Sequence, residues 1–135
     1  MAGLGQSLRE LRRLLGAHET SANRTARHWL FYKEAEECGD RLLSRNLSPV
    51  QREQYETRGY FDVVGGDSGN RYRIWHGYSM NVEQLDKFGR WECHLCFTPA
   101  AGLPVGDVML AQKLALELFE TEAIRVARRS LAPME

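Results

Sequence analysis

The spacing of apolar residues divides the chain into a helical first part, a strand-rich middle and a helical last part. Leucines recur at helical spacing over residues 4–15, and a second apolar stripe with that spacing runs through residues 22–44. Gly39 weakens the second segment, so we expect a break near it. From residue 60 the period shortens to about two residues, which is typical of half-buried strands.

The clearest helix start lies just before the strands. Ser48 is suited to the N-cap, Pro49 to the first helical position, and Gln51 to a return hydrogen bond to the cap. We expect a short helix over residues 49–57, ended by Gly59.

Four strands are predicted, over residues 60–64, 71–76, 79–85 and 90–98. Their short connections favour an antiparallel meander. The first connection, residues 65–70, contains three glycines. No helix follows it to hold a phosphate, so we expect a flexible hairpin tip.

Alternation along the strands separates two faces of the predicted sheet. An apolar face, which should pack on a helix, contains Phe61, Val63, Tyr72, Ile74, Met80, Val82, Trp91, Cys93, Leu95 and Phe97. The opposite, mixed face contains Arg71, Arg73, Trp75, Glu92, His94 and Cys96. The candidate ligand-binding residues on this second face are Arg71, Arg73, Trp75 and His94.

The last predicted helix covers residues 108–129, with Asp107 as its N-cap. Its first half is apolar on nearly every side, so it needs cover from the sheet and from either the N-terminal helices or a second copy of the chain. Lys113 and Glu117 are spaced to form an ion pair, which we expect at the exposed edge.

These elements predict a single α+β domain over residues 1–135. A helical segment, residues 1–46, precedes a unit over residues 47–129. That unit is expected to contain a short helix, a four-stranded antiparallel meander and a long C-terminal helix packed on the sheet.

Composition narrows the functional classes. The 135 residues include 18 basic and 18 acidic side chains, so no net charge attracts nucleic acid or an anionic membrane. No apolar run approaches the roughly 20 residues of a membrane span, and the first residues lack the pattern of a secretory signal. Three cysteines favour a reduced, cytoplasmic setting.

Cys93 and Cys96 raise the possibility of zinc, because this spacing supplies half of a tetrahedral site. No second pair with metal-ligand spacing completes it, and in a strand the two thiols would point to opposite faces. Zinc binding through these residues is therefore an alternative, and two small buried cysteines are the preferred interpretation.

The functional prediction is a non-enzymatic protein-interaction or oligomerisation module, with a homo-oligomer or a protein partner joined through the C-terminal helix. It rests on that helix and on the lack of a complete catalytic set around the four histidines. The alternative is a nucleic-acid or small-ligand binding domain that uses the basic and aromatic sheet face. No cofactor is expected, except zinc in the alternative in which Cys93 and Cys96 bind a metal.

Several stretches of the chain resemble a family of small uncharacterised bacterial proteins. The similar text lies within residues 47–127. It comprises S-P-x-Q at residues 48–51, GYFDVVG at 59–65, YRI at 72–74, MNV at 80–82, CxxCFTP at 93–99 and GDVMLAQKLALE at 106–117. The resemblance implies a bacterial origin and supplies no activity or site residue.

Overall fold

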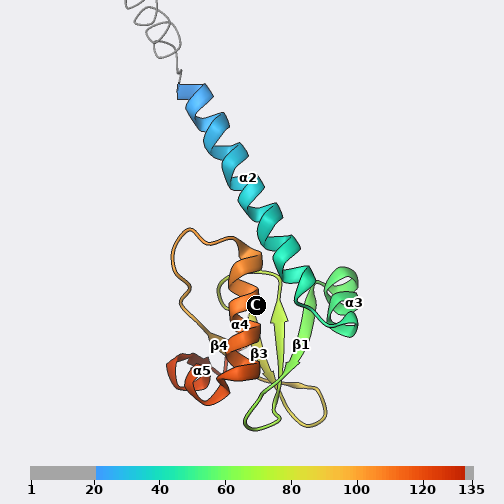
Figure 1. The fold of residues 1–135 in the computed structure, drawn as a ribbon. Coiled ribbons are helices and arrows are strands. Elements are labelled where there is room, and N and C mark those ends of the chain that lie inside the picture. The colour runs from blue at the N-terminus through green and yellow to red at the C-terminus, as the bar shows by residue number, and fades with distance from the viewer. Residues whose placement is uncertain (1–20, 133–135) are drawn as a thin grey trace, which may run out of the picture. The chain divides into compact units, whose positions relative to one another are not determined.

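The computed structural model describes residues 21–132. The chain is α+β, with helices and a five-stranded antiparallel sheet (Figure 1). It divides within its first described helix into two parts, Met1–Ala35 and Glu36–Glu135, and each is described by itself. The second part contains the sheet and the hydrophobic core. None of the described helices has both the length and the apolar character needed to cross a bilayer.

Helix α2 (Ser21–Arg45) runs without a break through Gly39, so the break expected there is wrong. Gly39 is buried where the start of the helix containing Gly106 crosses α2. A Cβ atom on Gly106 would overlap the backbone carbonyl of Gly39. The two glycines therefore permit close approach of two helices, a use that outweighs the low helical preference of glycine.

Helix α3 (Pro49–Arg58) confirms the predicted start signal. The Ser48 hydroxyl accepts from the backbone N–H of Gln51 at 3.2 Å, and the Ser48 N–H donates to the Gln51 side chain at 3.0 Å. Gly59 ends the helix with a left-handed φ of 75°, which glycine adopts without a steric penalty.

The sheet has the strand order β1-β2-β3-β4-β5, and every neighbouring pair is antiparallel. The strands are β1 (Tyr60–Val64), β2 (Arg71–Trp75), β3 (Val82–Leu85), β4 (Trp91–Cys96) and β5 (Arg128–Ser130). The first four confirm the predicted meander, although β3 is shorter than expected. The fifth strand was not predicted.

The C-terminal region corrects the prediction of one long helix. Helix α4 (Val105–Leu118) ends at Phe119, whose φ and ψ of −137° and 41° are not helical, and α5 (Glu120–Val126) follows. The chain then pairs as β5 with β4 and satisfies backbone groups that would otherwise be unpaired. The spacing of apolar residues along the helix gives no information about this pairing with a distant strand.

The start of α4 also differs from the prediction. The helix begins before Asp107, and Asp107 makes no capping hydrogen bond. Instead the Glu36 carboxylate, from α2, accepts the backbone N–H of Val105 at 3.2 Å. A cap supplied from a distant segment leaves no local sequence signal.

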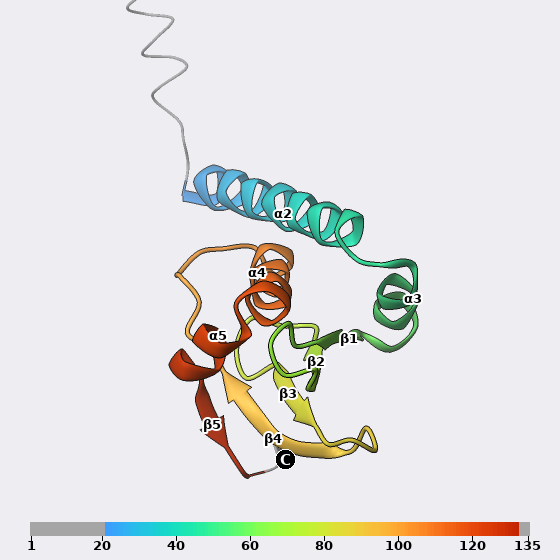
Figure 2. The ribbon, with the colours of Figure 1, turned by 60° about the horizontal axis from the view of Figure 1, so that its bottom comes forward.

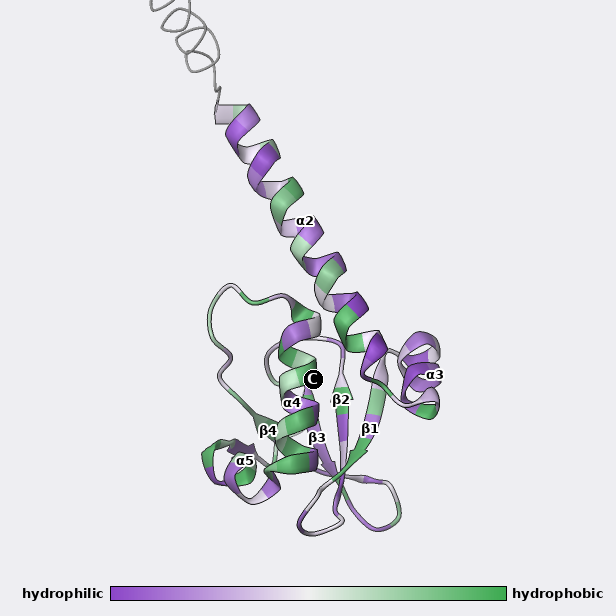
Figure 3. Ribbon diagram, viewed as in Figure 1, coloured by the Kyte–Doolittle hydropathy of each residue, from purple (hydrophilic) through white to green (hydrophobic). Residues whose placement is uncertain are grey.

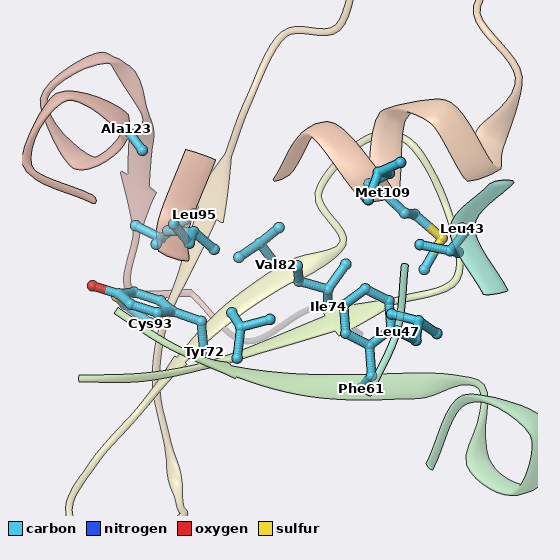
Figure 4. Packing of buried hydrophobic residues seen from close by; sticks show 13 residues of the cluster. Leu43, Leu47, Phe61, Tyr72, Ile74, Val82, Cys93, Leu95, Met109 and Ala123 are labelled. Carbon is cyan, nitrogen blue, oxygen red and sulfur yellow. The ribbon is translucent and has the colours of Figure 1, made fainter. Parts of the chain in front are cut away.

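The hydrophobic core lies between α4 and one face of the sheet. Figure 3 shows that α4 is largely apolar, and Figure 4 shows Met109 of α4 and Leu43 of α2 pointing toward Phe61 and Ile74. Most of the predicted apolar face is buried here, namely Phe61, Val63, Tyr72, Ile74, Val82, Cys93 and Leu95. Met80 and Trp91 are exceptions and belong to the other side of the sheet.

The outer edge of β1 is closed by side chains of α3. Gln51 donates to the backbone carbonyl of Asp62 at 2.9 Å, and Gln54 accepts the backbone N–H of Asp62 at 3.0 Å. These two bonds occupy the groups that an added strand would need. Within residues 36–132, α4 covers one face of the sheet and no helix covers the opposite, outer face (Figure 2).

Candidate functional site

A pocket of about 370 Å³ lies on the outer face, across β2, β3, β4 and the β2–β3 connection. Its lining residues are Trp75, His76, Ser79, Met80, Asn81, Glu83, Trp91 and His94. We call this the outer-face pocket. Its volume lies within the range of roughly 300 to 1,000 Å³ that is usual for small-molecule sites.

His94 is the most unusual residue of the pocket. It is on β4 opposite Glu83 of β3, and it is only 5% exposed. Its Nδ1 atom is buried and has no hydrogen-bond partner among the described residues. Because buried polar atoms in folded proteins are nearly always partnered, an atom of this kind marks a candidate site.

Trp91 reaches the pocket because of a β-bulge. Gln84 pairs with Cys93, but the next residue, Leu85, pairs with Trp91, so Glu92 is left without a partner in the ladder. The extra residue reverses the alternation, and Trp91 lies on the His94 side of the sheet, with the two ring centroids 5.4 Å apart. Simple alternation placed Trp91 on the apolar face, and that prediction is wrong.

The β2–β3 connection forms the rim of the pocket. The backbone of Met80 has a left-handed φ of 53°, which is uncommon for residues other than glycine, asparagine and aspartate. Asn81 fixes the connection: its side chain exchanges hydrogen bonds of 2.8 and 2.9 Å with Gln112 of α4, and its backbone carbonyl accepts from Trp75. This buried amide pair joins the rim to the core helix.

Trp75 and His76 form the wall on the β2 side. The Trp75 ring packs against Tyr60, with centroids 4.8 Å apart, and is 38% exposed. The Nδ1 atom of His76 lies 2.8 Å from the Tyr55 hydroxyl. Burial, and then the charge of Asp40, raise the pKa of Tyr55, so the hydroxyl remains protonated and can donate to His76.

Of the four candidate ligand residues, the structure brings Trp75 and His94 to one pocket and places the two arginines outside it. Arg73 forms a two-pronged ion pair with Asp62 at 2.8 and 3.1 Å, and Arg71 approaches the same carboxylate at 3.6 Å. The hydrogen bond to Asp62, which outweighs partial burial, raises the pKa of Arg73. The Arg73 guanidinium also lies 3.9 Å from the centroid of Tyr60.

The candidate zinc residues are not brought together. Cys93 is buried in the core cluster, whereas Cys96 is partly exposed. The two cysteines are three residues apart on β4, and side chains at that spacing in a strand point to opposite faces of the sheet. Within residues 21–132, no cluster of three or more His, Cys, Asp or Glu side chains is arranged to hold a metal ion.

Lys113 and Glu117 form the predicted pair, but Lys113 is buried. Its Nζ atom lies 2.6 Å from Glu117, whose other carboxylate oxygen accepts from Gln51 at 3.4 Å. The expectation of an exposed edge is therefore wrong for Lys113, which is 8% exposed. Because the buried charge is compensated, these residues join α3 to α4 and leave no free group for chemistry.

The glycine-rich connection of residues 65–70 binds a carboxylate of its own chain. Glu120 is 3% exposed and accepts from the backbone N–H groups of Asp67 and Ser68 at 2.8 and 2.7 Å, from the Ser68 hydroxyl, and from the Tyr72 hydroxyl at 2.7 Å. Asp67 in turn accepts from the backbone and hydroxyl of Thr121. The predicted flexible tip is instead a carboxylate-binding loop.

Sequence reasoning missed the contribution of Ser79, Asn81 and Glu83 to the outer-face pocket. Glu83 had a usable signal, because on β3 it alternates with Val82 and lies between the strands that contain Trp75 and His94. Ser79 and Asn81 lie in an irregular connection, where periodicity gives no direction for a side chain.

Comparison with protein-family models, curated proteins and solved structures found no match to this chain.

Proposed function

We propose that this protein binds a small organic ligand in the outer-face pocket. The observation that carries the proposal is that His94, a lining residue of the pocket, is nearly completely buried and has an Nδ1 atom without a hydrogen-bond partner among the described residues. An unmade buried hydrogen bond costs about 1–3 kcal/mol. Because no protein hydrogen bond is made by this nitrogen, a ligand group that reached it would satisfy a polar atom that the described residues leave unpaired.

The lining chemistry supports a ligand with an apolar body and one polar group. Trp75, Met80 and Trp91 supply aromatic and apolar walls, while Ser79 and Glu83 supply polar groups. A mainly apolar cavity with a few convergent polar groups is the usual composition of a small-molecule site.

Binding is better supported than catalysis. In residues 21–132, neither His76 nor His94 is hydrogen-bonded to a serine, a cysteine or a carboxylate, and a nucleophile needs such a base. Small-ligand binding is also better supported than nucleic-acid binding, because Arg71 and Arg73 both face Asp62.

The test is protein-observed NMR with a panel of small amines, alcohols, acids and aromatic rings, in a Trp29→Phe background so that the two pocket indoles give the only indole signals. We expect a subset of the panel to shift both indole N–H signals and the amide of His94. Trp91→Ala should abolish binding of that subset. Phe88→Ala, which removes an exposed aromatic outside the pocket, should not. Shifts scattered over the surface, or none, would refute the proposal.

Self-association through α4 is a second proposal. Val108, Met109 and Leu116 of this helix are buried within their own chain, whereas Leu114, Leu118 and the following Phe119 are exposed. These three residues are the apolar surface that a second copy would cover. Light scattering over a tenfold concentration range tests self-association, with Leu118→Glu as the variant and Leu131→Glu as the control. A dimer that is lost only in Leu118→Glu supports the proposal. A native protein that is monomeric at every concentration refutes it.

A further inference from the structure

We infer that the polar group of the ligand is an alkylated ammonium ion. This inference rests on the proposed ligand-binding function of the outer-face pocket and adds the chemical class of the ligand. It is carried by three features of the described lining residues: one carboxylate that forms no ion pair, two partly exposed indole rings, and no basic side chain other than histidine.

Glu83 supplies the negative charge. Among residues 21–132, neither lysine nor arginine lines the pocket, and Glu83 forms no ion pair within 4 Å. Arg73 is the cross-strand neighbour of Glu83 and feels its charge, but the Arg73 guanidinium is bonded to Asp62. A cation in the pocket would therefore meet a carboxylate that the protein leaves available.

The two indoles supply the complementary surface. Trp75 and Trp91 are 38% and 37% exposed, and each is held on one side by a neighbouring ring, Tyr60 and His94 respectively. The face of an indole attracts a cation more strongly than any other aromatic side chain, and partly desolvated sites strengthen that attraction.

The cations of the described part of the chain do not occupy these two rings. Arg73 lies over Tyr60, Lys33 over Trp29, and Lys87 and Arg90 over Phe88. The outer-face pocket therefore combines available indole surface with an available carboxylate, and a carrier of positive charge from outside the chain fits both. Alkyl groups on the nitrogen suit the contact with Met80 and the rings, because they weaken hydration of the ion.

The experiment compares choline with its uncharged isostere 3,3-dimethyl-1-butanol, using fluorescence titration of the Trp29→Phe protein at constant ionic strength. We expect choline to bind at least about fivefold more tightly, the ratio that corresponds to one cation–π contact. Equal or weaker binding of choline would overturn the ammonium inference while leaving ligand binding intact. Absence of binding by the whole NMR panel is the separate result that would overturn the proposed function.

Two variants locate the charge effect. Glu83→Gln should weaken choline binding about fivefold or more and leave binding of the neutral isostere unchanged. Glu92→Gln is the matched control, because Glu92 is an exposed carboxylate of β4 outside the pocket, bonded to Gln84 at 3.1 Å. Equal loss in both variants would mean a general surface charge effect and would contradict the inference. Unchanged circular dichroism of each variant excludes misfolding as the cause.

An alkylated ammonium group can come from two sources, a free small molecule or a methylated lysine in a peptide. A short peptide with trimethyllysine, compared with the same peptide with unmodified lysine, separates them. Tighter binding of the methylated peptide than of choline assigns the site to a peptide, and the reverse order assigns it to a free quaternary amine. Binding of both cations that is no tighter than binding of the neutral isostere would overturn the inference.

Discussion

At the scale of single residues, Glu120 accepts four hydrogen bonds from the carboxylate-binding loop and Tyr72. Burial by itself raises the pKa of its carboxyl group, and hydrogen bonds from Ser68, Tyr72 and the backbone N–H groups of residues 67 and 68 outweigh burial, so the pKa is lowered. Burial, followed by the bond to Glu120, raises the pKa of Tyr72, which therefore stays a donor. One ionised side chain thus organises the whole carboxylate-binding loop.

Glu120→Gln should destabilise the protein by about 2–3 kcal/mol, because the amide keeps one acceptor and turns a donor toward the donors of the loop. Urea unfolding at neutral pH measures the loss. Glu122→Gln is the control, since Glu122 is on the same helix and pairs with Arg125 in solvent. Equal free energies of unfolding for the two variants would refute the role of Glu120.

Acid should weaken the same contact. Because the folded-state pKa of Glu120 lies below its ordinary value of 4.5, the unfolded chain takes up the proton more readily. The stabilisation is complete above about pH 4.5 and is lost as pH falls through the folded-state pKa. The stability difference between the native protein and Glu120→Gln should therefore narrow below pH 4.5. A difference that is constant from pH 7 to pH 3 would contradict this.

At the scale of elements, the position of α4 depends on a close contact between two glycines and on hydrogen bonds from other segments to its ends. Gly39 and Gly106 allow α2 and α4 to cross backbone to backbone, and Glu36 caps α4 from α2. At the other end of α4, the backbone N–H of Gly66 donates to the carbonyl of Leu116 at 3.1 Å. The boundaries of α4 are thus set by its neighbours, and its own sequence contributes no capping side chain.

Gly106→Ala distinguishes two physical effects, because they change the free energy of unfolding in opposite directions. Helical preference alone predicts that alanine stabilises the helix by about 1 kcal/mol. The close approach to Gly39 predicts destabilisation by about 1–3 kcal/mol, because the added methyl group meets backbone that cannot turn away. Thermal and urea unfolding decide between them, and a more stable variant would mean that the two helices do not cross as described.

At the scale of the molecule, the described residues of the hydrophobic core all follow the division at residue 35. The cluster begins at Leu43 and includes side chains of the sheet, α4 and α5. In the first part, by contrast, the aromatic and apolar side chains of residues 29–32 are exposed. The described apolar contacts that stabilise the sheet therefore belong to residues 36–132.

Deletion of residues 1–35 should leave a chain that unfolds cooperatively, with a free energy of unfolding within about 1 kcal/mol of the full-length value, since every described core residue is retained. Circular dichroism during urea denaturation measures this. The shortened chain retains Glu36 and Gly39, so the cap and the crossing of α4 are preserved. A broad, non-cooperative transition would show that the first part supports the core.

The sequence predicted the features that depend on near neighbours. Ser48 and Gln51 lie three residues apart, so their capping box is a local event, and alternation placed residues such as Phe61 and Ile74 on the buried face. For the outer-face pocket, the same alternation placed Trp75 and His94 on one side of the sheet. These inferences succeed because the backbone period fixes the direction of nearby side chains.

Tertiary structure alone decided the rest. The bulge at Glu92 places Trp91 on the outer face of the sheet. Glu120 is hydrogen-bonded by a loop more than fifty residues earlier in the chain, and β5 pairs with the edge of β4. Each depends on a partner that is remote in sequence and whose unpaired donors or acceptors are created only when the sheet assembles. The sequence by itself therefore determined the α+β class and most of the buried face, and the assembled sheet determined the pocket.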